Sequence, residues 1–163
     1  TSNDGLKFPD GKGIDFSADG NNAGMESELL DDYEEGQFTL EPNANLTFDS
    51  SWNSGSYIKI GKLVHVRGYF SPDSTGGTGT DNVQITLPFS AENAAEHATS
   101  GANGIMHRNI DGVGDVVCAW VAGNATTFWL FTCQDNGAWA AINNSNISDA
   151  TECYFSFTYR AAS

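Results

Sequence analysis

The fold is decided by the stretch Tyr57-Ile58-Lys59-Ile60-Gly61-Lys62-Leu63-Val64-His65-Val66-Arg67-Gly68-Tyr69-Phe70. Two runs rich in β-branched and aromatic residues stand on either side of Gly61-Lys62, and such residues favour β-strands. The short separation predicts a tight hairpin between strands at 56–60 and 63–70. In the second run Val64 and Val66 alternate with polar residues, which predicts a strand with one apolar face.

The same period of two residues continues along the chain. It is clearest near the C-terminus, where every second residue is apolar: Cys153, Phe155, Phe157 and Tyr159. The segments predicted as strands are 37–41, 45–49, 56–60, 63–70, 83–89, 104–110, 115–121, 127–133, 138–142 and 152–160. Strands do not alternate with helical segments. The pattern therefore predicts an all-β fold, a jelly-roll-like antiparallel β-sandwich, over residues 37–163.

Composition limits the classes of partner. The chain has 163 residues, 21 acidic against 7 basic, and a formal net charge of -14. This charge repels phosphate backbones and anionic lipid surfaces, so nucleic-acid binding and membrane insertion are not expected. No apolar stretch is long enough to cross a bilayer, and the first residues lack the pattern of a signal peptide.

Residues 1–36 are predicted to form an extended N-terminal attachment arm that ends in a short acidic joint. The turn-rich residues 1–24 hold too little apolar surface to fold alone. Residues 25–35 are predicted to form about two helical turns that end at Gly36. We expect the apolar residues of this segment to pack into a partner surface: Leu6, Phe8, Ile14, Phe16, Leu29, Leu30 and Tyr33.

A second interface is predicted in the domain itself. The segments Val116–Val121 and Thr127–Cys133 are apolar on both faces, so this hairpin should be covered on both sides. In a chain of this length the second cover is expected to be another copy. The expected interface residues are Phe128, Trp129 and Phe131.

The three cysteines are predicted to be free thiols. Cys118, Cys133 and Cys153 lie in apolar runs without metal-ligand spacing. Cys118 and Cys133 have unequal offsets from the turn between their strands, which predicts non-opposing positions and no close approach of the sulfurs. Reduced thiols are typical of folding in a cytosol.

No catalytic, metal or cofactor site is predicted. His65 is expected on the surface or at an interface, and the serines form no nucleophile elbow. The pairs Asp31-Asp32 and Glu34-Glu35 suit a hard cation such as calcium but lack fixed ligand spacing, so a solvated acidic face is expected. Trp52 and Trp139 are candidate contacts for sugar rings, whereas Trp120 and Trp129 are expected in the core or an interface.

Four motifs, taken in order and spacing, resemble a module that recurs in structural proteins of tailed bacteriophages, especially marine ones. They are Gly13-Ile14-Asp15-Phe16-Ser17-Ala18; Met25 through Gly36 with the core Ser-Glu-Leu-Leu-Asp-Asp-Tyr-Glu-Glu-Gly; Tyr57-Ile58-Lys59-Ile60-Gly61 followed by Leu63-Val64-His65-Val66-Arg67-Gly68; and Ile85-Thr86-Leu87-Pro88-Phe89. In that module the Asp-Tyr-Glu-Glu-Gly segment marks the passage from a stalk or attachment arm to a C-terminal β-domain, and the copies usually form trimers. The likeness covers residues 13–89. The usual Thr-Trp-Thr-Pro continuation is replaced by Gln37-Phe38-Thr39-Leu40-Glu41-Pro42.

The resemblance implies a non-enzymatic virion surface protein, a homotrimer assembled in the host cytoplasm. Its partners would be the phage major capsid protein or other virion proteins. The length favours a capsid decoration, cement or knob protein that docks through its arm. The alternative is the tip of a tail or head fibre that binds a host surface glycan; a polysaccharide-cleaving enzyme is a more distant alternative.

Overall fold

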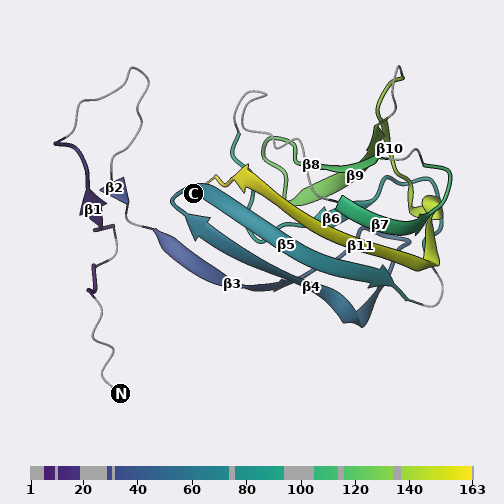
Figure 1. The fold of residues 1–163 in the computed structure, drawn as a ribbon, viewed down its shortest axis with the longest axis horizontal. Coiled ribbons are helices and arrows are strands. Elements are labelled where there is room, and N and C mark those ends of the chain that lie inside the picture. The colour runs from purple at the N-terminus through teal and green to yellow at the C-terminus, as the bar shows by residue number, and fades with distance from the viewer. Residues whose placement is uncertain are drawn as a thin grey trace.

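The structure is a computed structural model that describes residues 6–9, 11–18, 29–30, 32–73, 76–93, 105–113, 116–133 and 137–162. Two antiparallel sheets face each other (Figure 1). The larger sheet has the order β3-β4-β5-β11-β7, formed by Tyr33–Thr39, Phe48–Ile60, Leu63–Pro72, Ile147–Arg160 and Ile105–Ile110. In the smaller sheet β9 (Thr127–Cys133) pairs with β6 (Gln84–Thr86), β8 (Val116–Trp120) and β10 (Ala140–Ala141). The predicted all-β fold and antiparallel sandwich are confirmed.

The hairpin predicted from the sequence joins β4 to β5. Ile60 pairs with Leu63 across Gly61, whose φ of +55° suits a tight turn. This register turns Val64 and Val66 inward, where both are fully buried, and leaves His65 and Arg67 exposed on the outer face. The alternation of the sequence therefore fixes which face of β5 enters the core.

The core lies between the two sheets. Phe128 of β9 contacts Phe155 and Phe157 of β11 with ring centroids 5.1 Å apart in both pairs. Fully burying one such side chain contributes about 1.5–3 kcal/mol. The predicted alternation of β11 is confirmed, since Cys153, Phe155, Phe157 and Tyr159 are buried and Tyr154, Ser156 and Thr158 are exposed.

Strand β4 is longer than predicted. The segments 45–49 and 56–60 were expected as separate strands, but one strand runs from Phe48 to Ile60 with a register irregularity between Phe48 and Asn53. Ser54, Gly55 and Ser56 in the polar middle of this strand pair on both sides, with β3 and β5. The backbone hydrogen bonds to the two neighbouring strands thus outweigh the low strand propensity of these polar residues.

The helical joint was predicted wrongly where the structure describes it. Leu29–Leu30 form β2, which pairs with β1 (Ile14–Asp15), and Tyr33 begins β3. Residues 25–28 and Asp31 lie outside the described residues. Gly36, expected to end a helix, lies in the middle of β3, so the larger sheet begins inside the segment assigned to the arm and joint.

The acidic residues of the joint explain why a strand forms here. Lys59 of β4 is buried, and its ammonium forms ion pairs with Asp32 and, at 3.6 Å, with Glu34. The same ammonium lies 5.5 Å from the ring centroid of Phe89. Because pairing β3 with β4 brings two carboxylates to a buried cation, the extended conformation is favoured over a solvated helix.

Candidate functional site

Three surfaces carry the residues that the sequence singled out. The first is the arm, the described residues 6–9, 11–18 and 29–30. Its two short strands, β1 and β2, lie apart from the two sheets beyond the start of β3 (Figure 1). Leu6 is 90% exposed, and the six other predicted arm residues, Phe8, Ile14, Phe16, Leu29, Leu30 and Tyr33, are 38–62% exposed. The structure brings Ile14 opposite Leu30, which the sequence did not predict.

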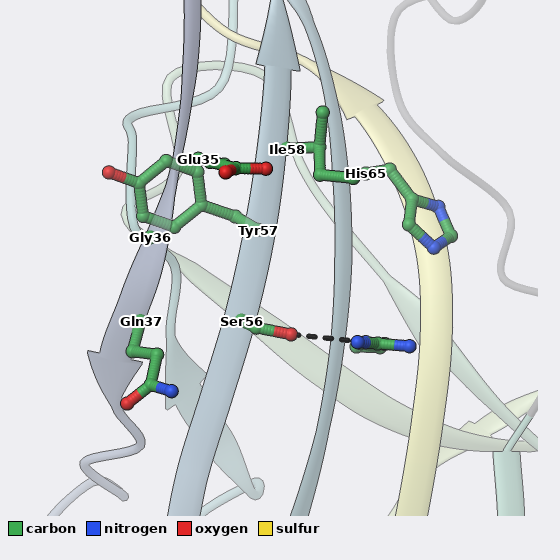
Figure 2. A pocket seen from close by; sticks show the side chains of 8 residues that line it. Glu35, Gly36, Gln37, Ser56, Tyr57, Ile58 and His65 are labelled. Carbon is green, nitrogen blue, oxygen red and sulfur yellow. Dashed lines mark hydrogen bonds between the residues drawn. The ribbon is translucent and has the colours of Figure 1, made fainter. Parts of the chain in front are cut away.

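The second surface is the outer face of the larger sheet. Cross-strand pairing aligns Gln37, Ser56, Arg67 and Ser156 in one row, and Glu35, Ile58, His65 and Thr158 in the next. Figure 2 shows Gln37 and Ser56 on neighbouring strands, with Glu35, Ile58 and His65 one row away. Two adjoining depressions of about 560 and 520 Å³ lie over these rows and share Gln37, Ser56 and Arg67.

Arg67 lies at the centre of this surface. Its Nε donates a hydrogen bond to Ser56 Oγ at 3.1 Å. Among the described residues from 32 onward, the other Lys and Arg side chains each have a carboxylate within ion-pair distance: Lys59, Lys62, Arg108 and Arg160. Within this same range, Arg67 has none. His65 lies beside it, with Nδ1 3.1 Å from Thr158 Oγ1 and Nε2 3.4 Å from Ser156 Oγ. This guanidinium can therefore donate hydrogen bonds to an external anion or hydroxyl group.

Aromatic rings border the second depression. Tyr69 and Tyr154 have ring centroids 4.4 Å apart, and the edge-on ring of Trp52 lies 5.8 Å from Tyr69. Trp52 is 54% exposed and Tyr154 45% exposed. Burial, followed by the negative charge of Glu152, raises the pKa of Tyr69, so its hydroxyl stays protonated and can donate. The sequence identified Trp52 but missed both tyrosines and Arg67, because their proximity depends on strand register.

The third surface is the outer face of the smaller sheet. Four aromatic rings contact one another there: Trp120, Trp129, Phe131 and Trp139. Trp139 is 62% exposed. Trp52 and Trp139 lie by different sheets and do not form one site. Phe128 was wrongly expected at an interface, since it turns inward and is fully buried. Trp129 and Phe131 remain half-buried on the outer face.

The thiols lie partly on this same face. All three cysteines are free, as predicted. Cys118 pairs with Phe131 and Cys133 with Val116, so the two positions are not opposed. Their sulfurs are nevertheless 3.3 Å apart. The expectation of no close approach was wrong, because diagonal neighbours on two adjacent strands can turn their side chains toward each other.

The described part of the chain contains no cluster of three or more His, Cys, Asp or Glu side chains that could hold a metal ion. Within it, no helix is long and apolar enough to cross a membrane. The Tyr33 hydroxyl donates to Glu35 at 3.1 Å, and this bond raises the pKa of Tyr33.

Comparison of the chain with protein-family models, curated proteins and solved structures found no match. The geometry of the three surfaces is therefore the evidence on function.

Proposed function

We propose that the chain is a non-enzymatic bacteriophage virion surface protein, a homotrimeric capsid decoration, cement or knob protein. It docks on the major capsid protein or another virion protein through its N-terminal arm after assembly in the host cytoplasm. The jelly-roll-like β-sandwich then projects outward. The observation that carries this proposal is the exposure of all seven apolar arm residues, at 38–90%.

These residues support docking because a large part of each apolar side chain stays exposed to solvent. Strands β1 and β2 have two residues each, and a hairpin of this size is not stable alone in water. Burying their side chains in a partner surface would offset the cost of ordering the arm. Each bound copy then stabilises the assembled particle by mass action.

Replacement of both Phe8 and Phe16 by Ala tests the proposal. Loss of two buried phenyl rings should weaken docking by about 3–6 kcal/mol, which corresponds to at least about a hundredfold in affinity. The measurement is co-sedimentation of the purified protein with particles that lack it. Trp52→Ala is the matched control, because Trp52 is 54% exposed against 53% for Phe16 but lies on the larger sheet. Wild-type occupancy by the double variant would rule out docking through the arm.

A second candidate function, binding of a host surface glycan by a fibre tip, is favoured by Arg67 and the neighbouring rings. Aromatic faces pack against the apolar faces of sugar rings, and a guanidinium without an ion pair can bind hydroxyl or carboxylate oxygens. The edge of the second depression offers both within one surface, at Arg67, Tyr69 and Tyr154.

Arg67→Ala should reduce glycan binding roughly tenfold or more, since a charge-assisted hydrogen bond is removed. The measurement is binding to an array that contains neutral and carboxylated oligosaccharides. Trp139→Ala is the control, because Trp139 lies by the other sheet. If no oligosaccharide binds, or if binding depends on Trp139 and not on Arg67, this second function is wrong.

A further inference from the structure

Two thiols lie close together on the outer face of the smaller sheet. Cys133 ends β9 and is exposed, and Cys118 lies on β8 and is half-buried. The Cys133 thiol donates to the Cys118 sulfur at 3.3 Å. Neither thiol takes part in the arm or in the Arg67 surface.

The environment gives the two sulfurs different reactivity. Burial first, and then the neighbouring Cys133, raises the pKa of Cys118 to about 11. At neutral pH Cys118 is therefore protonated, and the exposed Cys133 is the sulfur that an external reagent meets first. Cys153 is fully buried in the core, and burial raises its pKa to about 12, so it should not react in the folded protein.

We propose that Cys118 and Cys133 form a site of thiol–disulfide exchange with small-molecule disulfides such as oxidised glutathione, which converts the pair into an intramolecular disulfide. The Cys133 thiolate attacks one sulfur of the reagent, and one glutathione thiolate leaves. The Cys118 thiol then loses its proton to solvent and attacks the Cys133 sulfur of the mixed disulfide, and the second glutathione leaves. Two protein thiols are oxidised to one disulfide, and one glutathione disulfide is reduced to two thiols.

The first step prepares the second. Once Cys133 is in a mixed disulfide its sulfur is neutral, so no thiolate charge beside Cys118 opposes loss of the Cys118 proton. The attacked sulfur starts 3.3 Å away, within reach of a small side-chain rotation.

The diagonal register makes the product reversible. A disulfide bond is about 2.0 Å long, so the sulfurs must approach by about 1.3 Å from their present 3.3 Å separation. Cys118 and Cys133 face Phe131 and Val116 rather than each other, so closing the bond strains the strand pair. Strained disulfides are reduced more easily than relaxed ones. The pair should therefore be dithiol in a cytosol and disulfide in an oxidising medium.

The test is a titration of the folded wild-type protein in glutathione buffers with an increasing share of the oxidised form. Samples are quenched with acid, alkylated and analysed by intact mass and peptide mapping. We expect the loss of two hydrogen masses, a link between Cys118 and Cys133, an unmodified Cys153, and reversal by excess reduced glutathione.

Single substitutions separate the two steps. Cys118→Ser should stop at a glutathione adduct on Cys133, and Cys133→Ser should stay unmodified. Cys153→Ser is the matched control and should form the link like the wild type, provided that circular dichroism shows it folded. An unmodified wild type, a wild type that stops at the adduct, or a link between two copies would each overturn the proposal. These results do not depend on whether the chain is a virion protein.

Discussion

At the scale of residues, glycines decide where large rings lie on the inner face of the larger sheet. A Cβ atom at Gly36, Gly55 or Gly68 would lie 2.9, 2.5 or 2.6 Å from the side chain of Tyr57, Phe38 or Phe155, respectively. In each case the ring belongs to the neighbouring strand. It lies over the glycine backbone, in the space that the Cβ atom of any other residue would occupy. The sequence shows each glycine and each ring, but the pairs follow only from register, so it could not predict them.

Gly55→Ala should destabilise the sandwich by about 1–3 kcal/mol, because the added methyl group displaces the Phe38 ring from the backbone of β4. The free energy of unfolding in urea measures this change. Ser54→Ala is the matched control, since Ser54 is the preceding residue and is exposed. Equal midpoints for Gly55→Ala and the wild type would show that Phe38 does not lie over Gly55.

At the scale of elements, the sequence predicted best those strands whose own side chains alternate. Strands β5 and β11 carry an apolar face within one continuous run, and both were predicted. The joint was predicted as a helix because Leu29, Leu30 and Tyr33 could serve as its apolar contacts and carboxylates stand near its start. Asp32 and Glu34 form ion pairs with Lys59 of β4, which is buried. The sequence of residues 25–36 alone does not indicate this partner.

Removal of residues 1–30 should leave the free energy of unfolding nearly unchanged, because the two described arm strands, β1 and β2, pack mainly on each other. Removal of residues 1–39 should destabilise the domain by about 3 kcal/mol or more, since it deletes β3 and leaves Lys59 buried without a carboxylate. Urea titration of both truncated proteins measures the difference. If the shorter truncation unfolds the domain, the arm belongs to the core.

At the scale of the whole molecule, the sandwich has two outer faces with different chemistry. The larger sheet presents Arg67 among hydroxyl groups, and the smaller sheet presents four aromatic rings that half-cover one another. An aromatic face of this kind is typical of association between copies. Self-association through these four rings would leave the polar face, the arm and the exposed end of β9 at Cys133 accessible.

We expect the purified protein to have three times the 17.4 kDa mass of the chain in light scattering at micromolar concentration. Replacement of Trp129 and Phe131 together by Ala should give a folded monomer. Both rings lie on the outer face, and the buried Phe128, which packs in the core, is retained. Trp52→Ala should stay a trimer. A monomeric wild type would contradict association through this face.

The acidic strand β3 also affects how crowded copies behave. It is the last strand of the larger sheet, so one row of its backbone groups has no strand partner among the described residues. Such an edge can recruit the edge of another copy and start aggregation. Here Glu34 and Glu35 place negative charge along it, within a chain of net charge -14. Two copies meeting edge to edge bring these carboxylates together, so the arrangement protects solubility at high local concentration.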